Sequence, residues 1–204
     1  PGARRQLIGH EYEVWGVAYS YDGLSVFSGD GSLSISDGNL IQWDTQTGDI
    51  LQSFEGGHTD RIYSVATSPD GRYVATGSQD TRVIIWEIAT GEPRHILDNH
   101  TGVIFDVMFT NDSSRLLSAD GNSTIVWNVE TGALINQYNT LHDDIILDMD
   151  ITADDRLVFS GSFDTTIKLW ELDTGNVLLS LQAGQITGAQ FFPDEMRAVT
   201  TDQN

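Results

Sequence analysis

The sequence contains no cysteine, which excludes disulfide frameworks, thiolate zinc sites, iron–sulfur clusters and cysteine nucleophiles. Proline is scarce, at 4 of 204 residues. No apolar run approaches the roughly 20 residues that a membrane-spanning helix needs. These absences assign no compartment, but they exclude several classes of site and a helical membrane span.

Basic residues are also few, at 10 Lys and Arg against 30 Asp and Glu, which gives a net charge of −20. A chain this acidic repels phosphate and anionic lipid at long range. We therefore expect no nucleic-acid partner and no membrane partner. The simplest interpretation is that the charge keeps the chain soluble. Among possible partners, basic proteins or basic peptides are favoured by the negative electrostatic field of the chain.

The sequence does contain an internal repeat with a period of about 42 residues. Histidines, tryptophans and Thr-Gly pairs recur at this spacing, so that independent markers share one period. The tryptophans, spaced by 43, 41 and 43 residues, are Trp43, Trp86, Trp127 and Trp170. The histidines, spaced by 48, 42 and 42 residues, are His10, His58, His100 and His142.

Each repeat unit shows a pattern of short strands. In the second unit, residues 62–68 alternate and carry β-forming side chains, residues 69–71 form a Pro-Asp-Gly turn, and residues 73–76 follow as a second strand. Residues 83–86 are a continuous apolar run, typical of a strand buried on both faces, and residues 94–97 complete the unit. Four strands per period predict one four-stranded antiparallel sheet per repeat.

One such sheet cannot bury its own faces, but copies stacked around an axis can. The sequence resembles the WD-repeat β-propeller family over nearly its whole length. The resemblance is carried by a histidine at the start of each unit and a tryptophan near its end, followed by Asp44, Glu87, Asn128 or Glu171. It implies an all-β fold, a β-propeller built from four-stranded antiparallel blades.

Residues 1–204 are expected to form a single segment of such a propeller, as a partial ring. Four full repeats cover about residues 10–57, 58–99, 100–141 and 142–183, and an incomplete repeat covers residues 184–204. Residues 4–9 are expected to be the outer strand of a preceding blade. Seven blades at this period need roughly 300 residues. We therefore expect the missing blades to come from further chain or from a second copy.

Histidine, serine or threonine, aspartate and tryptophan recur together in the units, which invites comparison with a catalytic triad. A triad would occur once rather than four times, and the resemblance implies a structural hydrogen-bond network instead. The expected members are His10, Ser28, Asp37 and Trp43; His58, Thr76, Asp80 and Trp86; His100, Ser118, Asp120 and Trp127; and His142, Ser160, Asp164 and Trp170. We predict no catalytic residue.

A group of acidic residues in the fourth unit could suggest a calcium loop. The spacing of Asp148, Asp150, Asp154 and Asp155 does not match an EF-hand, which needs Gly at position 6 and a closing Glu. Asp148 and Asp150 point to one face of an expected inner strand, and Asp106 is equivalent to Asp148 in the preceding unit. We expect these side chains to line a wet central channel, and we predict no metal site and no cofactor.

The predicted interaction surface lies where the innermost strands begin. The resemblance implies that partner contacts fall three and five residues after each unit-start histidine. Three of the four later positions are aromatic, as is typical of interface hot spots, and an insertion at residues 30–39 belongs on the same face. The alternative is that these side chains only pack in the channel mouth or against the next blade. The predicted surface consists of Glu13, Trp15, Arg61, Tyr63 and Phe105, with Gln79 and Phe163 at its rim.

The sequence shows no metal motif, no phosphate loop and no nucleophile signature, so it favours a non-catalytic scaffold. The resemblance implies that this scaffold binds proteins or peptides on the propeller face, by analogy at the family level. One alternative is a sensor or targeting module of a larger multidomain protein. Another is an enzyme or small-molecule binder that uses the central channel, which would require a unique, unrepeated cluster of titratable residues.

Overall fold

The computed structural model describes residues 6–32, 37–121, 123–139, 141–184, 186–191 and 198–202. Within these ranges every helix or strand assigned is a β-strand. Each repeat forms an antiparallel sheet in which consecutive strands are neighbours, because the connecting turns are short. The all-β fold class predicted from the sequence is therefore confirmed.

Four sheets of four strands form the blades, and a two-stranded hairpin follows them. The first blade is β1 (Val14–Tyr19), β2 (Ser25–Asp30), β3 (Gly38–Asp44) and β4 (Ile50–His58). The second is β5 (Ile62–Thr67), β6 (Tyr73–Ser78), β7 (Val83–Glu87) and β8 (Pro93–Leu97). The third is β9 (Asp106–Phe109), β10 (Arg115–Ala119), β11 (Thr124–Asn128) and β12 (Leu134–Tyr138). The fourth is β13 (Ile146–Ile151), β14 (Leu157–Ser162), β15 (Thr166–Glu171) and β16 (Val177–Gln182), and the hairpin is β17 (Ile186–Phe191) and β18 (Ala198–Asp202).

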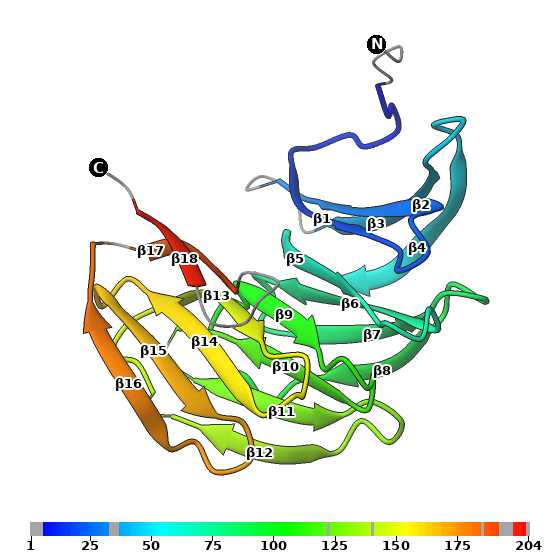
Figure 1. Ribbon diagram of the computed structural model, residues 1–204. Helices are drawn as coiled ribbons and strands as arrows, with labels where there is room; N and C mark the ends of the chain where they lie inside the picture. Colours follow the sequence, from blue (N-terminus) through cyan, green and yellow to red (C-terminus); the bar gives the residue numbers. More distant parts are fainter. Residues whose placement is uncertain are drawn as a thin grey trace.

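The innermost strands β1, β5, β9, β13 and β17 lie side by side in that order, and the sheets fan outward from them (Figure 1). The blades describe an arc that is open between the first blade and the β17–β18 hairpin (Figure 1). This is the arrangement of a partial propeller, as predicted.

The hydrophobic core lies between neighbouring blades. In β7, Val83 and Ile85 pack toward the third blade, whereas Ile84 and Trp86 pack toward the first. Because successive side chains of a strand point to opposite faces, this apolar run serves two interfaces at once. The tryptophan that ends each unit is fully buried, and Trp86 meets Phe54 of the preceding blade edge-on at 5.8 Å between ring centroids.

The buried tryptophans explain why glycine precedes the histidine in two of the units. A Cβ atom on Gly57 would lie 2.2 Å from Cη2 of Trp86, and one on Gly9 would lie 2.8 Å from Cη2 of Trp43. The backbone before the histidine therefore passes flat against the buried indole, where a side chain would collide with it.

The segment before the first histidine has no blade of its own among the described residues. Residues 6–9 form no strand, although residues 4–9 were expected to be the outer strand of a preceding blade; residues 4 and 5 lie outside the described ranges. An outer strand exists only by pairing with the third strand of its own blade, and none of the described strands is placed to do so. Gly9 lies against the Trp43 ring, and the outer strand at residues 4–9 stays a prediction.

Candidate functional site

The repeated histidine network is complete in the second blade. The His58 ring has its Nδ1 atom 3.0 Å from Asp80 Oδ2 and its Nε2 atom 2.7 Å from Thr76 Oγ1. Trp86 Nε1 donates to the same Thr76 hydroxyl at 2.9 Å. A neutral imidazole protonated on Nδ1 satisfies all four side chains. The third and fourth blades repeat the arrangement with His100, Ser118, Asp120 and Trp127, and with His142, Ser160, Asp164 and Trp170.

In the first blade the structure corrects one predicted member. His10 Nδ1 lies 2.8 Å from Asp30 Oδ2, whereas Asp37 is exposed. Ser28 bonds both His10 and Trp43, as expected. The sequence-based prediction chose Asp37 because it lies six residues before Trp43, but an insertion separates the second strand from that tryptophan. The network follows the second strand instead, and Asp30, two residues after Ser28, is the last residue of β2.

Three aspartates of this network, Asp80, Asp120 and Asp164, have a lowered pKa. Burial raises the pKa of Asp80. Hydrogen bonds from His58 and from the Thr59 and Arg82 amides outweigh this effect and lower the pKa to about 2. The pKa of Asp164 is likewise about 2. Burial lowers the pKa of His142 below its ordinary 6.5, which favours the neutral ring. These buried groups join the segment before each blade to the second strand of that blade and to the turn that follows it.

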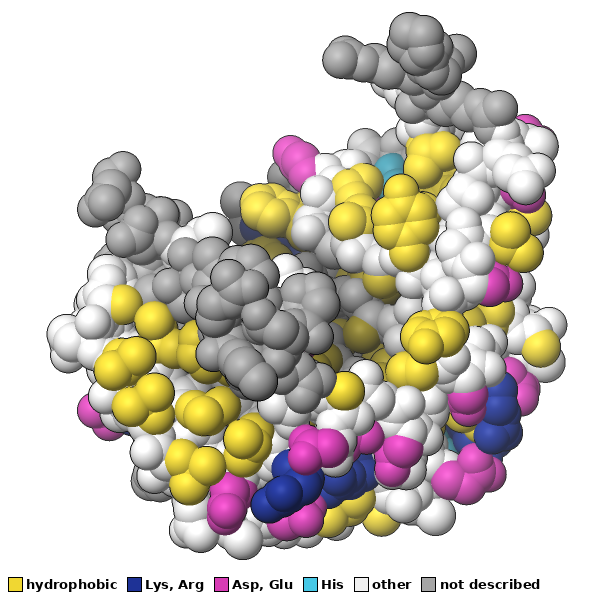
Figure 2. All heavy atoms as spheres, in the orientation of Figure 1, with side chains coloured by type: hydrophobic (Ala, Val, Ile, Leu, Met, Phe, Trp, Pro, Cys, Tyr) yellow, Lys and Arg dark blue, Asp and Glu magenta, His cyan; other side chains and the backbone are white. Residues whose placement is uncertain are grey.

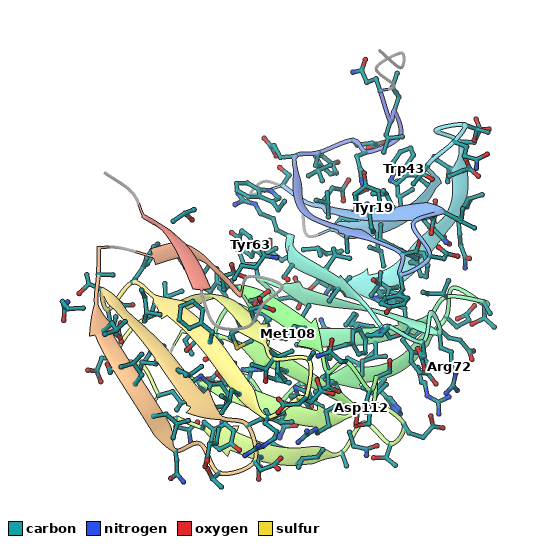
Figure 3. All side chains as sticks on the ribbon, in the orientation of Figure 1. Tyr19, Trp43, Tyr63, Arg72, Met108 and Asp112 are labelled. Carbon is teal, nitrogen blue, oxygen red and sulfur yellow. The ribbon has the colours of Figure 1, made fainter. Side chains whose placement is uncertain are left out.

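The predicted interaction residues form a continuous aromatic surface across three blades. The Trp15 and Tyr63 rings meet edge-on at 5.6 Å between centroids, and Tyr63 and Phe105 are 5.5 Å apart. Tyr63 lies near the beginning of β5, close to the first blade (Figure 3). Trp15 is 48% exposed, whereas the other four tryptophans are exposed by 1% or less. We refer to Trp15, Tyr63 and Phe105 as the aromatic surface.

Arg61 lies beneath this aromatic surface. Its guanidinium carbon is 5.1 Å from the Trp15 ring centroid, and Nη1 donates to Tyr63 Oη at 3.2 Å. The Tyr63 hydroxyl donates in turn to Gln79 Oε1 at 2.9 Å. Arg61 is only 8% exposed, so that a cation is nearly buried among aromatic side chains.

Two further residues of the predicted interaction surface, Glu13 and Phe163, make no ring contact with the aromatic surface among the described residues. Glu13 is exposed, and its carbonyl accepts a hydrogen bond from the Gly31 amide, which brings the start of the inserted loop to this face. An added Cβ on Gly31 would lie 2.5 Å from Arg61 Cα. Residues 33–36 of the insertion lie outside the described ranges. Phe163 is half-buried, and the described residues show no ring contact between it and the aromatic surface.

One expected channel residue, Asp106, connects three blades. Asp106 accepts hydrogen bonds from Ser64 Oγ of the second blade and from the Met149 amide of the fourth. Burial and the nearby Asp148 carboxylate raise the pKa of Asp106 well above its ordinary value. In the described part of the chain, no three His, Asp or Glu side chains are arranged to hold a metal ion. The described residues also include no helix long and apolar enough to cross a bilayer.

A pocket that the sequence analysis missed lies at the opposite ends of the strands. It measures about 360 Å³ and separates the β1–β2 turn from the β5–β6 turn, with Tyr21, Asp22, Asp70 and Gly71 among its lining residues. Gly71 occupies the turn position where Ser113 and Asp155 stand in the later blades. A glycine at this turn position is therefore the sequence feature that could have predicted the pocket.

A known family model matches the chain four times, once for each repeat. The WD domain, G-beta repeat, matches residues 3–44, 48–87, 91–128 and 135–171. The second to fourth matches each contain the outer strand of one blade and the first three strands of the next.

Several curated proteins are similar to the chain. A U3 snoRNP-associated protein-like EMB2271 of Arabidopsis thaliana is 27% identical over 194 residues, covering 86% of this chain and 39% of that protein. Autophagy-related protein 16 of the same plant is 26% identical, covering 85% and 33%. A guanine nucleotide-binding protein subunit beta of Oryza sativa subsp. japonica is 26% identical, covering 95% and 54%. The chain thus spans between one third and about half of the length of these relatives.

Proposed function

The chain belongs to the WD domain, G-beta repeat family, and on that premise we propose that it is a non-catalytic scaffold that binds a protein or peptide on its aromatic surface. Two relatives carry names that place them in assemblies, one as a subunit and one as a snoRNP-associated protein. The net charge of −20 favours a partner that is basic overall.

The observation that carries this proposal is the half-exposed aromatic surface. The buried histidine networks occupy their own hydrogen-bonding groups, so they offer little to a ligand. Trp15, Tyr63 and Phe105 instead present contiguous apolar area from three blades, with Arg61 beneath and polar groups at the rim. Aromatic and arginine side chains in such a group are typical of residues that dominate binding energy.

A displayed random-peptide library tests the proposal without knowledge of the natural partner. Peptides selected on the wild-type chain are assayed against the double variant Trp15→Ala/Tyr63→Ala. We expect affinity to fall by at least about tenfold, because truncating two hot-spot aromatics removes much of the contact.

The matched control is Tyr19→Ala/Tyr21→Ala, which removes two aromatic side chains that are exposed near the other end of β1. This control should leave selected peptides bound. Peptides that bind the folded Trp15→Ala/Tyr63→Ala variant as tightly as wild type would contradict the proposal and direct attention to the blade edges or the opposite face.

A further inference from the structure

Arg61 differs from the other described arginines in that its guanidinium forms no ion pair, although its backbone amide donates a hydrogen bond to the Asp60 carboxylate. Five others each lie within 4.0 Å of a carboxylate oxygen: Arg72, Arg82, Arg94, Arg115 and Arg156. Arg61 is the most buried of the six, yet in the described part of the chain its Nε atom has no hydrogen-bond partner and its guanidinium forms no ion pair. Arg94 also has an Nε atom without a partner, but its guanidinium pairs with Glu130, so Arg61 alone among the described arginines forms no ion pair.

The groups around Arg61 neutralise little of its charge. A guanidinium has five N–H donors, and among the described residues its one side-chain hydrogen bond goes to the neutral Tyr63 hydroxyl. The Trp15 ring contributes a cation–π contact. A buried cation without a counter-ion is unfavourable, and an anion that reaches it in a partly dry site gains a strong charge-assisted bond.

We propose that Arg61 receives one carboxylate from the protein partner, an Asp or Glu side chain adjacent to an apolar side chain that lies on Trp15. This inference rests on the proposed function, because it assigns chemistry to the same surface. Arg61 is 8% exposed, and the Trp15 ring beside its guanidinium is 48% exposed. The partner as a whole can still be basic, since this contact is local.

The charges favour a carboxylate over a phosphate. A phosphoserine carries about −1.5 to −2 at neutral pH and is usually bound by more than one cation. Arg61 supplies one positive charge, and the guanidinium of Arg82 in the β6–β7 turn already lies beside Asp80 and Thr59. A singly charged carboxylate balances Arg61, whereas a phosphate would leave excess negative charge on an acidic protein.

Trp15 provides a direct reporter for this site. With 5-fluorotryptophan incorporated, the chain gives five ¹⁹F signals, one for each tryptophan, and Trp15→Phe identifies the signal of the exposed one. The probes are capped hexapeptides Gly-Leu-X-Gly-Lys-Lys in which X is glutamate, glutamine or phosphoserine. Titration of each peptide then yields an affinity at this surface.

We expect the glutamate peptide to bind about tenfold more tightly than the glutamine peptide, as a charge-assisted bond replaces a neutral one. We expect the phosphoserine peptide to bind no more tightly than the glutamate peptide. Arg61→Leu should abolish the preference for glutamate while leaving the glutamine peptide nearly unaffected. Arg156→Leu makes the same charge change in the β13–β14 turn and should leave the preference intact.

Each outcome bears on a different claim. Equal binding of the glutamate and glutamine peptides to wild type overturns the role of Arg61 but leaves the aromatic surface in place. Tighter binding of phosphoserine overturns the carboxylate assignment. If no probe shifts the Trp15 signal, this inference fails, whereas the proposed function is decided by the library-selected peptides. Arg61→Lys keeps the charge and should show a reduced preference, which provides a second variant if Arg61→Leu does not fold.

Discussion

In the histidine network, the aspartate that contacts the histidine ring comes from one of two positions in the repeat. In the second and fourth blades the aspartate lies four residues after the serine or threonine, as Asp80 does after Thr76. In the first and third it lies two residues after, as Asp30 does after Ser28. The turn geometry between the second and third strands determines which carboxylate reaches the ring, so a fixed spacing from the tryptophan fails where that turn is longer.

The corrected assignment predicts different effects for two neighbouring aspartates. Asp30→Ala should lower the free energy of unfolding by about 1–3 kcal/mol, because the Asn39 amide loses a buried acceptor and the 2.8 Å contact with His10 is lost. Asp37→Ala should change it by less than about 0.5 kcal/mol, since Asp37 is exposed. Urea unfolding of both variants measures these values. Equal destabilisation by the two substitutions would contradict the role given to Asp30.

The same networks predict a loss of stability in acid. Asp80 and Asp164 have folded-state pKa values of about 2 against an ordinary 3.8, so between these pH values the unfolded chain binds protons that the folded chain does not. His142 acts in the same direction below its ordinary 6.5, because its folded-state pKa is lowered. Asp106 acts in the opposite direction above pH 3.8, because its folded-state pKa is raised, so the fall in melting temperature should be concentrated between about pH 4 and 2.

Asp80→Asn tests the origin of this acid transition. The variant should be less stable than wild type at pH 7, yet its melting temperature should change less between pH 4 and pH 2, because one titrating group has been removed. A slope identical to that of wild type in this range would show that Asp80 does not contribute.

At the scale of the strand and turn, one position links each blade to its predecessor. Ser113 and Asp155 both have left-handed backbones, with φ of 61° and 57°, and both reach back to amides of the preceding blade's turn. Gly71 adopts the same φ without a side chain, and the pocket between the first two blades opens there. The turn residue therefore sets how closely neighbouring blades are joined on this face.

Asp155→Ala should weaken the junction between the third and fourth blades. The carboxylate accepts hydrogen bonds from the Asn111 and Asp112 amides at 2.7 and 3.0 Å. Its removal should cost about 1–2 kcal/mol of unfolding free energy, because these donors return to solvent. Asp173→Ala is the control, since it removes an exposed carboxylate whose salt bridge to Arg115 should contribute less than about 1 kcal/mol. Equal effects of the two substitutions would refute the proposed link.

The strands were largely predictable from the sequence, because their signals are local and repeated. The apolar run at residues 83–86 and the Pro-Asp-Gly turn before it place β7 and β6 nearly where the structure has them. The aromatic surface was predictable because its residues share a position in the repeat. The burial of Arg61 was not, since it depends on Trp15 of another blade and on the backbone of Gly31.

At the scale of the whole molecule, the arc leaves two blade faces in solvent. Apolar side chains are exposed over the first blade and over β15 and β16 (Figure 2). Strand register identifies Leu181 as the counterpart of Phe54, because each pairs with the residue three before its blade's tryptophan. Phe54 is buried by the next blade, whereas Leu181 is 48% exposed. The same kind of side chain that forms the core between blades is therefore solvent-exposed here.

These faces predict that the 204-residue chain self-associates in solution, because contiguous exposed apolar surface and an unpaired strand edge favour contact with another copy. The net charge of −20 opposes this contact, so light scattering should report a larger average mass at 0.5 M salt than at low salt, where repulsion is less screened. Val17→Lys with Leu181→Lys places charge on both faces and should restore the monomer. Ile96→Lys is the control, because Ile96 is exposed on the edge of the second blade, whose two faces are covered. A wild-type chain that stays monomeric at millimolar concentration and high salt, with one sharp unfolding transition, would mean that these faces do not drive association.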